Sequence, residues 1–179
     1  MADTALLVVD MLNAYEHPDA EQLTTSVADM VDPLAELIAE GRRRADVDVI
    51  YVNDNFGDFT GTWDDIVAKA LDGARPDLVK PILPTPDCLR LTKVRHSAFF
   101  STQLDYLLQQ LQPERLVIAG QVTEQCVLYT ALDAYVRHYN VVVAPDAVAH
   151  IDADLGKAAL KMMQSNMRAE LVPAADCLP

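Results

Sequence analysis

The chain has 179 residues, of which 51% are hydrophobic, and this size and composition suit one globular domain with a sizeable core. Its formal net charge of −13 argues against a nucleic-acid partner, because phosphate binding requires clustered lysine and arginine. No apolar run approaches the ~20 residues that span a bilayer, and the N-terminus lacks a signal-peptide pattern. We therefore expect a cytoplasmic protein with neither a nucleic acid nor a membrane as a partner.

Apolar runs typical of buried strands alternate along the chain with segments of helical periodicity. The predicted elements are, in order, strand 5–9, helix 21–44, strand 47–52, polar loop 53–62, helix 64–71, an extended connection 78–87, strand 89–93, helix 102–111, strand 115–119, helix 123–138, strand 140–144, helix 152–167 and strand 169–172. Pro33 is expected to kink the first helix or divide it into two.

This alternation predicts an α/β fold with three layers, in which helices cover both faces of an open, mostly parallel sheet of six strands. The class is Rossmann-like. The absence of a linker, repeat or low-complexity segment predicts a single domain over residues 1–179.

Candidate site residues follow several of the predicted strands directly. From the first strand to the fifth they are Asp10, then Asn53 and Asp54, then Lys93, then residues 120–126, then Pro145 and Asp146. Open parallel sheets bind ligands at the carboxyl ends of their strands. We therefore expect a carboxylate, an ammonium group and a thiol to meet at one edge of the sheet.

Cys126 lies where a helix is predicted to begin after the fourth strand. If Thr123 is the N-cap residue, Cys126 occupies the third helical position, beside unpaired backbone N–H groups. The helix dipole there favours thiolate over thiol, and the same N–H groups could hold a developing oxyanion. Cysteine is more often a packing residue, which is our interpretation of Cys88 and Cys177. The three cysteines are widely spaced and lack a CxxC pair, so they indicate neither a disulfide framework nor a zinc site.

The three kinds of side chain complement one another chemically. The thiol of Cys126 must lose its proton to attack a carbonyl, and Asp10 could accept that proton and later deliver it to a leaving amine. The ammonium group of Lys93 would stabilise both anions. The resulting thioester would be hydrolysed by water without a cofactor. Two simpler interpretations are that Asp10 caps a loop and that Lys93 is a solvated residue at a strand end.

Three segments together resemble the isochorismatase-like cysteine hydrolases, which include nicotinamidases, carbamoylsarcosine amidohydrolases and ureidoacrylate amidohydrolases. The segments are residues 7–13 (LVVDMLN), 93–99 (KVRHSAF) and 120–127 (GQVTEQCV), and they occur in the family's order and spacing. The resemblance covers nearly the whole chain.

The resemblance implies that the family's Asp-Lys-Cys triad falls on Asp10, Lys93 and Cys126. It also implies a non-proline cis peptide between Gln121 and Val122, with oxyanion contacts from the amides of Val122 and Cys126. Because the family commonly assembles, the resemblance further implies a homo-oligomer.

Two departures from the family's pattern bear on function. The usual glycine–valine pair before the cis peptide is Gly120–Gln121 here, so a polar side chain of unassigned direction enters the loop. Nicotinamidases carry a metal-binding Asp-x-His pattern and a further histidine after the second strand, whereas residues 53–59 contain no histidine. We therefore expect no metal and no nicotinamidase activity of the usual kind. Relatives that act on the vinyl ether of isochorismate often lack the cysteine, so Cys126 favours C–N hydrolysis.

Four side chains are candidates for lining a substrate pocket: Asn13, Tyr15, Phe59 and Trp63. Aromatic residues are more often part of the core, and Asn13 could equally shape a turn. The histidines, including His96 close to Lys93, show no metal-ligand spacing.

The leading prediction is a hydrolase without cofactor or metal that acts on a small carboxamide or ureido compound. Two alternatives stay open. One is vinyl-ether hydrolysis of an isochorismate-like acid with Asp10 as the proton donor, and the other is a catalytically silent binding or assembly module on the same fold.

Overall fold

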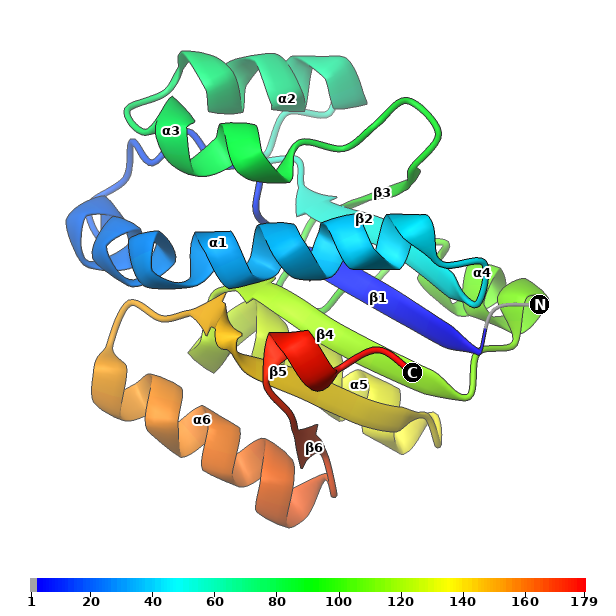
Figure 1. Cartoon of the computed structure of the whole chain (residues 1–179). Helices are drawn as coiled ribbons and strands as arrows, with labels where there is room; N and C mark the ends of the chain where they lie inside the picture. The colour runs from blue at the N-terminus through cyan, green and yellow to red at the C-terminus, as the bar shows by residue number, and fades with distance from the viewer. Residues whose placement is uncertain (1–2) are drawn as a thin grey trace.

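The computed structural model describes residues 3–179 and contains a six-stranded sheet between two layers of helices (Figure 1). The strands are β1 (Thr4–Val9), β2 (Val47–Asp54), β3 (Leu89–Lys93), β4 (Arg115–Gln121), β5 (Asn140–Ala149) and β6 (Glu170–Leu171). Their order across the sheet is β3-β2-β1-β4-β5-β6, and every neighbouring pair is parallel. The predicted fold class is confirmed.

The helices lie on both faces of this sheet. They are α1 (Ala20–Arg43), α2 (Trp63–Asp72), α3 (Pro76–Val79), α4 (Leu104–Leu111), α5 (Leu128–Val136) and α6 (Ala153–Asn166). α1, α2 and α3 pack on one face, and α4, α5 and α6 pack on the other (Figure 1). Among the helices of residues 3–179, none combines the length and the hydrophobicity needed to cross a bilayer.

β1 shows why its sequence is apolar without interruption. Successive side chains of a strand point to opposite faces, so Leu6 and Val8 enter the core under α1, while Ala5, Leu7 and Val9 enter the core under α4 to α6. Both faces of the strand are therefore covered, as in other parallel sheets.

α1 is one helix that contains Pro33, so the expectation that this proline could divide it into two is wrong. The buried stripe continues on both sides of the proline, with Val27 and Met30 before it and Leu34 and Ile38 after it. An interior proline costs about 3 kcal/mol, whereas each fully buried aliphatic side chain contributes about 1.5–3 kcal/mol. Packing of the stripe therefore outweighs the lost hydrogen bond.

The predicted extended connection at residues 78–87 is wrong in its first half. α3 runs into residue 79, and a 3₁₀ turn follows at Lys80–Ile82. Pro76 and Pro81 each lie in the first turn of one of these short helices. A proline there removes no helical hydrogen bond, and its fixed φ suits the turn.

β5 continues past its predicted end at residue 144 as far as Ala149. Its pairing with β4 shifts register between Ile118 and Gly120, so Pro145 and Asp146 lie in a bulge within the strand. A bulge accommodates a proline because the residues in it make no ladder hydrogen bonds. The prediction that Pro145 and Asp146 follow the fifth strand is therefore wrong.

The sheet changes direction of growth between its two central strands. From β1 the chain adds β2 and then β3 on one side, and from β4 it adds β5 and then β6 on the other side. Ligands of open parallel sheets bind at such a switch point, outside the carboxyl ends of the strands. The ends of β1 and β4 are therefore the place to look for a site.

Candidate active site

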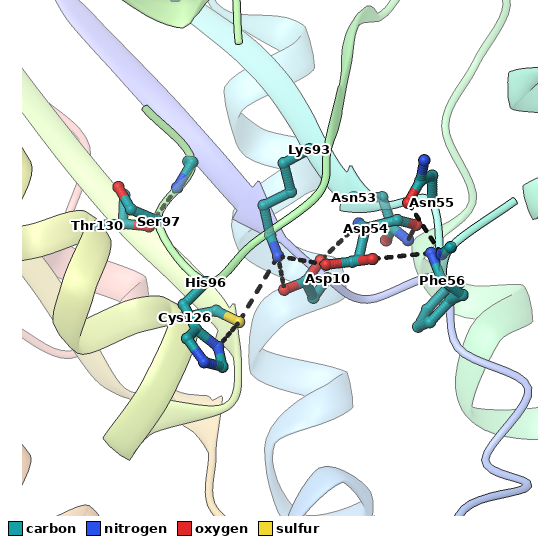
Figure 2. A network of polar contacts seen from close by, with 12 residues as sticks. Asp10, Asn53, Asp54, Asn55, Phe56, Lys93, His96, Ser97, Cys126 and Thr130 are labelled. Atoms are coloured by element: carbon teal, nitrogen blue, oxygen red, sulfur yellow. Dashed lines mark hydrogen bonds and ion pairs between the residues drawn. The ribbon is translucent and has the colours of Figure 1, made fainter. Parts of the chain in front are cut away.

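Three strand ends bring the predicted triad together at this switch point (Figure 2). Asp10 follows β1, Lys93 is the last residue of β3, and Cys126 lies in the turn after β4. The Nζ atom of Lys93 is 2.7 Å from Oδ2 of Asp10 and 3.7 Å from Sγ of Cys126. The ammonium group thus contacts both the carboxylate and the sulfur.

A second carboxylate, that of Asp54 at the end of β2, shares the ammonium group of Lys93. Oδ2 of Asp54 lies 3.2 Å from Nζ, and the Asp54 backbone N–H donates a 2.7 Å hydrogen bond to Oδ1 of Asp10. The Lys93 side chain is 0% exposed, so the ammonium group depends on these two carboxylates for its compensation. The sequence predicts that Asp54 lies at this edge of the sheet but does not indicate a function for it. The register of β2 and β3 pairs Asp54 with Lys93, and this pairing brings its carboxylate to the ammonium group.

The side chain of Gln121 points inward and fastens the end of β4 to the end of β1. Its Nε2 atom donates a 2.7 Å hydrogen bond to the backbone carbonyl of Asp10, and its Oε1 atom accepts one of 3.3 Å from the Tyr15 hydroxyl. Burial raises the pKa of Tyr15 to about 12, so this hydroxyl keeps its proton. The Gln121–Val122 peptide is cis. Gln121 is therefore a positioning residue for the backbone of Asp10.

The turn that carries Cys126 begins one residue earlier than predicted. It is a π-helical turn, Thr123–Val127, whose N-cap is Val122, and α5 follows it. The hydroxyl of Thr123 is engaged elsewhere, because it donates a 2.9 Å hydrogen bond to the carbonyl of Ala149 at the end of β5. The prediction that Thr123 is the N-cap is therefore wrong, and Cys126 is the fourth residue of the turn.

The surroundings of Cys126 favour its thiol form. Burial and the neighbouring charge of Asp10 raise the pKa of Cys126 to about 12, although Lys93 and a hydrogen bond from the Val122 backbone act in the opposite direction. These surroundings act against the predicted preference for the thiolate, because the start of the helical turn does not compensate for burial beside a carboxylate.

The carboxylate and the ammonium group are shifted as well. Burial raises the pKa of Asp10, against the lowering effects of Lys93 and of hydrogen bonds from Cys126 and Asp54. Burial lowers the pKa of Lys93, but the surrounding charges, above all that of Asp10, raise it further, so it lies above its ordinary value. Lys93 is therefore a cation, and Asp10 is a stronger base than an exposed carboxylate.

A cavity opens beside the Cys126 sulfur. Besides Asp10 and Cys126, side chains that line it include Asn13, His17, Asp19, Asp54, Phe56 and His96. His96 contacts the nucleophile candidate directly, with Nδ1 3.9 Å from Sγ, and its ring lies 5.4 Å from that of Tyr129.

Of the side chains predicted to line a pocket, Asn13 lines this cavity and three do not. Tyr15 is buried, with its hydroxyl on Gln121. Phe59 is 80% exposed, and Trp63 packs against the core under α1. The aromatic residue that does line the cavity is Phe56. No periodicity distinguishes it from Phe59 in the same polar loop.

Other groups that could bind a cofactor or react lie outside the cavity or are absent from the described chain. Within residues 3–179, no three His, Cys, Asp or Glu side chains gather in an arrangement that could hold a metal ion. Cys177 is buried in the core under α1, and Cys88 packs against the same core.

Comparisons with known proteins agree with the observed fold. The isochorismatase domain family matches residues 4–176. The chain is 34% identical over 170 residues to the uncharacterized isochorismatase family protein YaaI of Bacillus subtilis (strain 168), covering 95% of this chain and 93% of that one. It is 31% identical over 185 residues to ureidoacrylate amidohydrolase RutB of Caulobacter vibrioides (strain ATCC 19089 / CIP 103742 / CB 15), covering 88% and 82%. The crystal structure of N-carbamoylsarcosine amidase from Thermoplasma acidophilum is similar with a TM-score of 0.75 and 27% identity, covering 98% of each chain.

Proposed function

This chain belongs to the isochorismatase family of hydrolases, and we propose that it cleaves the C–N bond of a small amide or ureido compound through a thioester on Cys126. The observation that carries this proposal is the contact of one ammonium group, that of Lys93, with both the carboxylate of Asp10 and the sulfur of Cys126. Two relatives, named ureidoacrylate amidohydrolase and N-carbamoylsarcosine amidase, support C–N hydrolysis as the reaction class.

The first step joins sulfur to the carbonyl carbon of the substrate. Because Cys126 rests as a thiol, its proton must move to Asp10 while the C–S bond forms. The electron pair of the carbonyl π bond moves to oxygen and creates an oxyanion. The backbone amides of Val122 and Cys126 are the donors we assign to that oxyanion.

The second step releases the amine. The oxyanion re-forms the carbonyl, the C–N bond breaks, and Asp10 delivers the proton it took from sulfur to the departing nitrogen. Ammonia or an amine leaves, and a thioester on Cys126 remains. Asp10 is a carboxylate again and Lys93 still pairs with it.

Water completes the cycle. Asp10 takes a proton from the water molecule as its oxygen adds to the thioester carbonyl. The C–S bond then breaks, the sulfur recovers the proton from Asp10, and a carboxylic acid leaves. No step consumes a cofactor.

Lys93 and Asp54 set the charge of this machinery. Burial raises the pKa of Asp10 and so favours its protonated form, whereas the Lys93 ammonium group favours the ionised carboxylate. The carboxylate of Asp54 forms an ion pair with Lys93, and the backbone N–H of Asp54 donates a hydrogen bond to the carboxylate of Asp10. Lys93 is thus an electrostatic partner that need not exchange a proton during turnover.

The test is ammonia release from a panel of small primary amides, carbamoyl compounds and ureido compounds. We expect Cys126→Ala to lose at least about a thousandfold in kcat/KM, as is common when a nucleophile is removed. The matched control is Cys88→Ala, which removes a thiol that lies outside the cavity and should leave the rate unchanged. Ammonia release that survives Cys126→Ala would contradict the covalent mechanism. Pyruvate release from isochorismate that survives it would favour vinyl-ether hydrolysis, and no turnover of either kind would favour a binding module.

A further inference from the structure

The cavity beside Cys126 holds more negative than positive charge. The carboxylates of Asp10 and Asp54 share one ammonium group, that of Lys93. Asp19, just before α1, also lines the cavity, and it is exposed. In the described part of the chain its side chain takes part in no ion pair and does not cap α1. Three carboxylates therefore face the cavity against one lysine.

A carboxylate on a substrate would find no free lysine or arginine among the described lining residues, although the imidazoles of His17 and His96 belong to that lining. Within residues 3–179, neither a lysine nor an arginine belongs to the lining of the cavity, and the ammonium group of Lys93 lies behind it, already paired. Arg95 is close in sequence to His96, but it is exposed and does not line the cavity.

A second pocket shares part of the lining of the first, reaches α2, and among its described residues offers no free lysine or arginine either. The two share Asn13, His17 and Phe56, and the second also has Glu16, Asp58, Asp65 and Lys69 in its lining. Lys69 is already paired, with its Nζ 2.6 Å from Oδ2 of Asp58. A longer substrate that extends into this pocket therefore meets further carboxylates.

These charges act on any substrate that leaves water for the cavity. An anionic group loses hydration and is repelled by the lining, whereas a cationic group recovers Coulomb energy from the same side chains. We infer that the cavity accepts small amides whose remaining part is cationic or uncharged, rejects those that bear a carboxylate, and uses Asp19 as a specificity-determining residue. This inference rests on the hydrolase function proposed above. It predicts a substrate unlike ureidoacrylate, the carboxylate for which one relative is named.

The potential at Cys126 can be measured without any turnover. Methanethiosulfonates with an aminoethyl or a sulfonatoethyl group are similar in size and opposite in charge, and both react with the same thiolate. The ionised fraction of Cys126 therefore cancels from the ratio of their two rates. A Cys88→Ser background removes the half-buried thiol, and Cys177 is 0% exposed, so mass spectrometry would report modification of Cys126.

The measured quantity is the rate of the cationic reagent divided by the rate of the anionic one. We expect this rate ratio to be higher for Cys126 than for 2-mercaptoethanol, a thiol without a surrounding cavity. Asp19→Asn should lower this preference about two- to fivefold, the range for an exposed charge acting on a neighbouring one. The control is Asp29→Asn on the exposed side of α1, which removes the same charge away from the cavity and should leave the ratio unchanged. An equal or reversed preference in the parent protein, or a ratio that ignores Asp19→Asn, would overturn the inference.

Turnover of three amides of similar size supplies the second measurement. The expected order of kcat/KM is 4-aminobutyramide, then butyramide, then succinamate, and Asp19→Asn should narrow the differences by lowering the first and raising the last. Hydrolysis with succinamate as the best substrate would overturn the charge selection and leave the hydrolase function standing. No hydrolysis of any amide, together with a clear preference for the cationic reagent, would refute the hydrolase function and leave the charge of the cavity established.

Discussion

Replacing Gln121 with methionine should weaken the fold and the activity together, because one buried amide connects the ends of β1 and β4. Gln121 is 1% exposed, with a 2.7 Å hydrogen bond to the Asp10 carbonyl and a 3.3 Å hydrogen bond from the Tyr15 hydroxyl. Methionine has a similar unbranched shape, so it fills the space but leaves both partners unsatisfied. A buried polar group without a partner costs about 1–3 kcal/mol, so we expect a loss of about 2–4 kcal/mol in the free energy of unfolding.

The matched control is Tyr15→Phe, which removes only the longer of the two hydrogen bonds. We expect it to cost about 1 kcal/mol and to retain most of the activity. In Gln121→Met the Asp10 backbone is no longer held, and a small displacement of a base commonly costs about tenfold to a hundredfold in kcat. Urea denaturation followed by circular dichroism gives the stability, and ammonia release by the same samples gives kcat. A Gln121→Met protein with the stability of Tyr15→Phe and the parent kcat would refute the assigned role.

Three further substitutions test the electrostatics of the site and the backbone near it. Burial raises the pKa of Asp10, so kcat/KM should fall with decreasing pH already above the ordinary carboxyl range, where the base becomes protonated. In Asp54→Asn the ammonium group of Lys93 pairs with Asp10 alone, which favours the ionised form of Asp10. The acid limb of the pH profile should therefore move to lower pH. A shift to higher pH, or no shift, would contradict the shared pairing. Gly120→Ala should cost more than about 3 kcal/mol in urea denaturation, because φ is +117° and a Cβ would lie 2.2 Å from a carbonyl oxygen of β1. Gly57→Ala, at φ +79° with nothing within 4 Å, should cost only about 1 kcal/mol, and equal losses would contradict the close approach at Gly120.

Much of the fold and the meeting of the triad follow from local patterns. The run at residues 89–93 predicts β3 with its observed bounds, and in a parallel sheet every strand delivers its last residue to the same edge. Asp10, Lys93 and the loop after β4 could therefore be placed together without knowledge of a single distance. The bulge in β5 could not, because it arises from a register shift against β4.

The ionisation of the site residues could not be predicted from the sequence. A helix start predicts a thiolate, but the pKa of Cys126 depends on how deeply it is buried and on a carboxylate more than a hundred residues away. The direction of the Gln121 side chain is set in the same way, by Asp10 and Tyr15 on another loop.

The residues that line the cavity could not be predicted from the sequence either. An aromatic residue type indicates a side chain that can be buried but not the surface it covers, so Phe59 and Phe56 look alike in one polar loop. The path of the loop after β1 is determined by long-range hydrogen bonds, such as the 2.9 Å bond from the Leu12 N–H to Oδ1 of Asn53. In the folded chain Asp19 lines the cavity, whereas Trp63 packs against the core under α1.

The most direct test of the covalent mechanism is mass spectrometry of the protein quenched in acid during turnover of an amide substrate. The expected result is a mass increase equal to the acyl group of the substrate, on the peptide that contains Cys126, which disappears together with ammonia release in Cys126→Ala. Ammonia release at the parent rate by Cys126→Ala, or an acyl group carried on another residue, would contradict the assignment of Cys126 as the nucleophile.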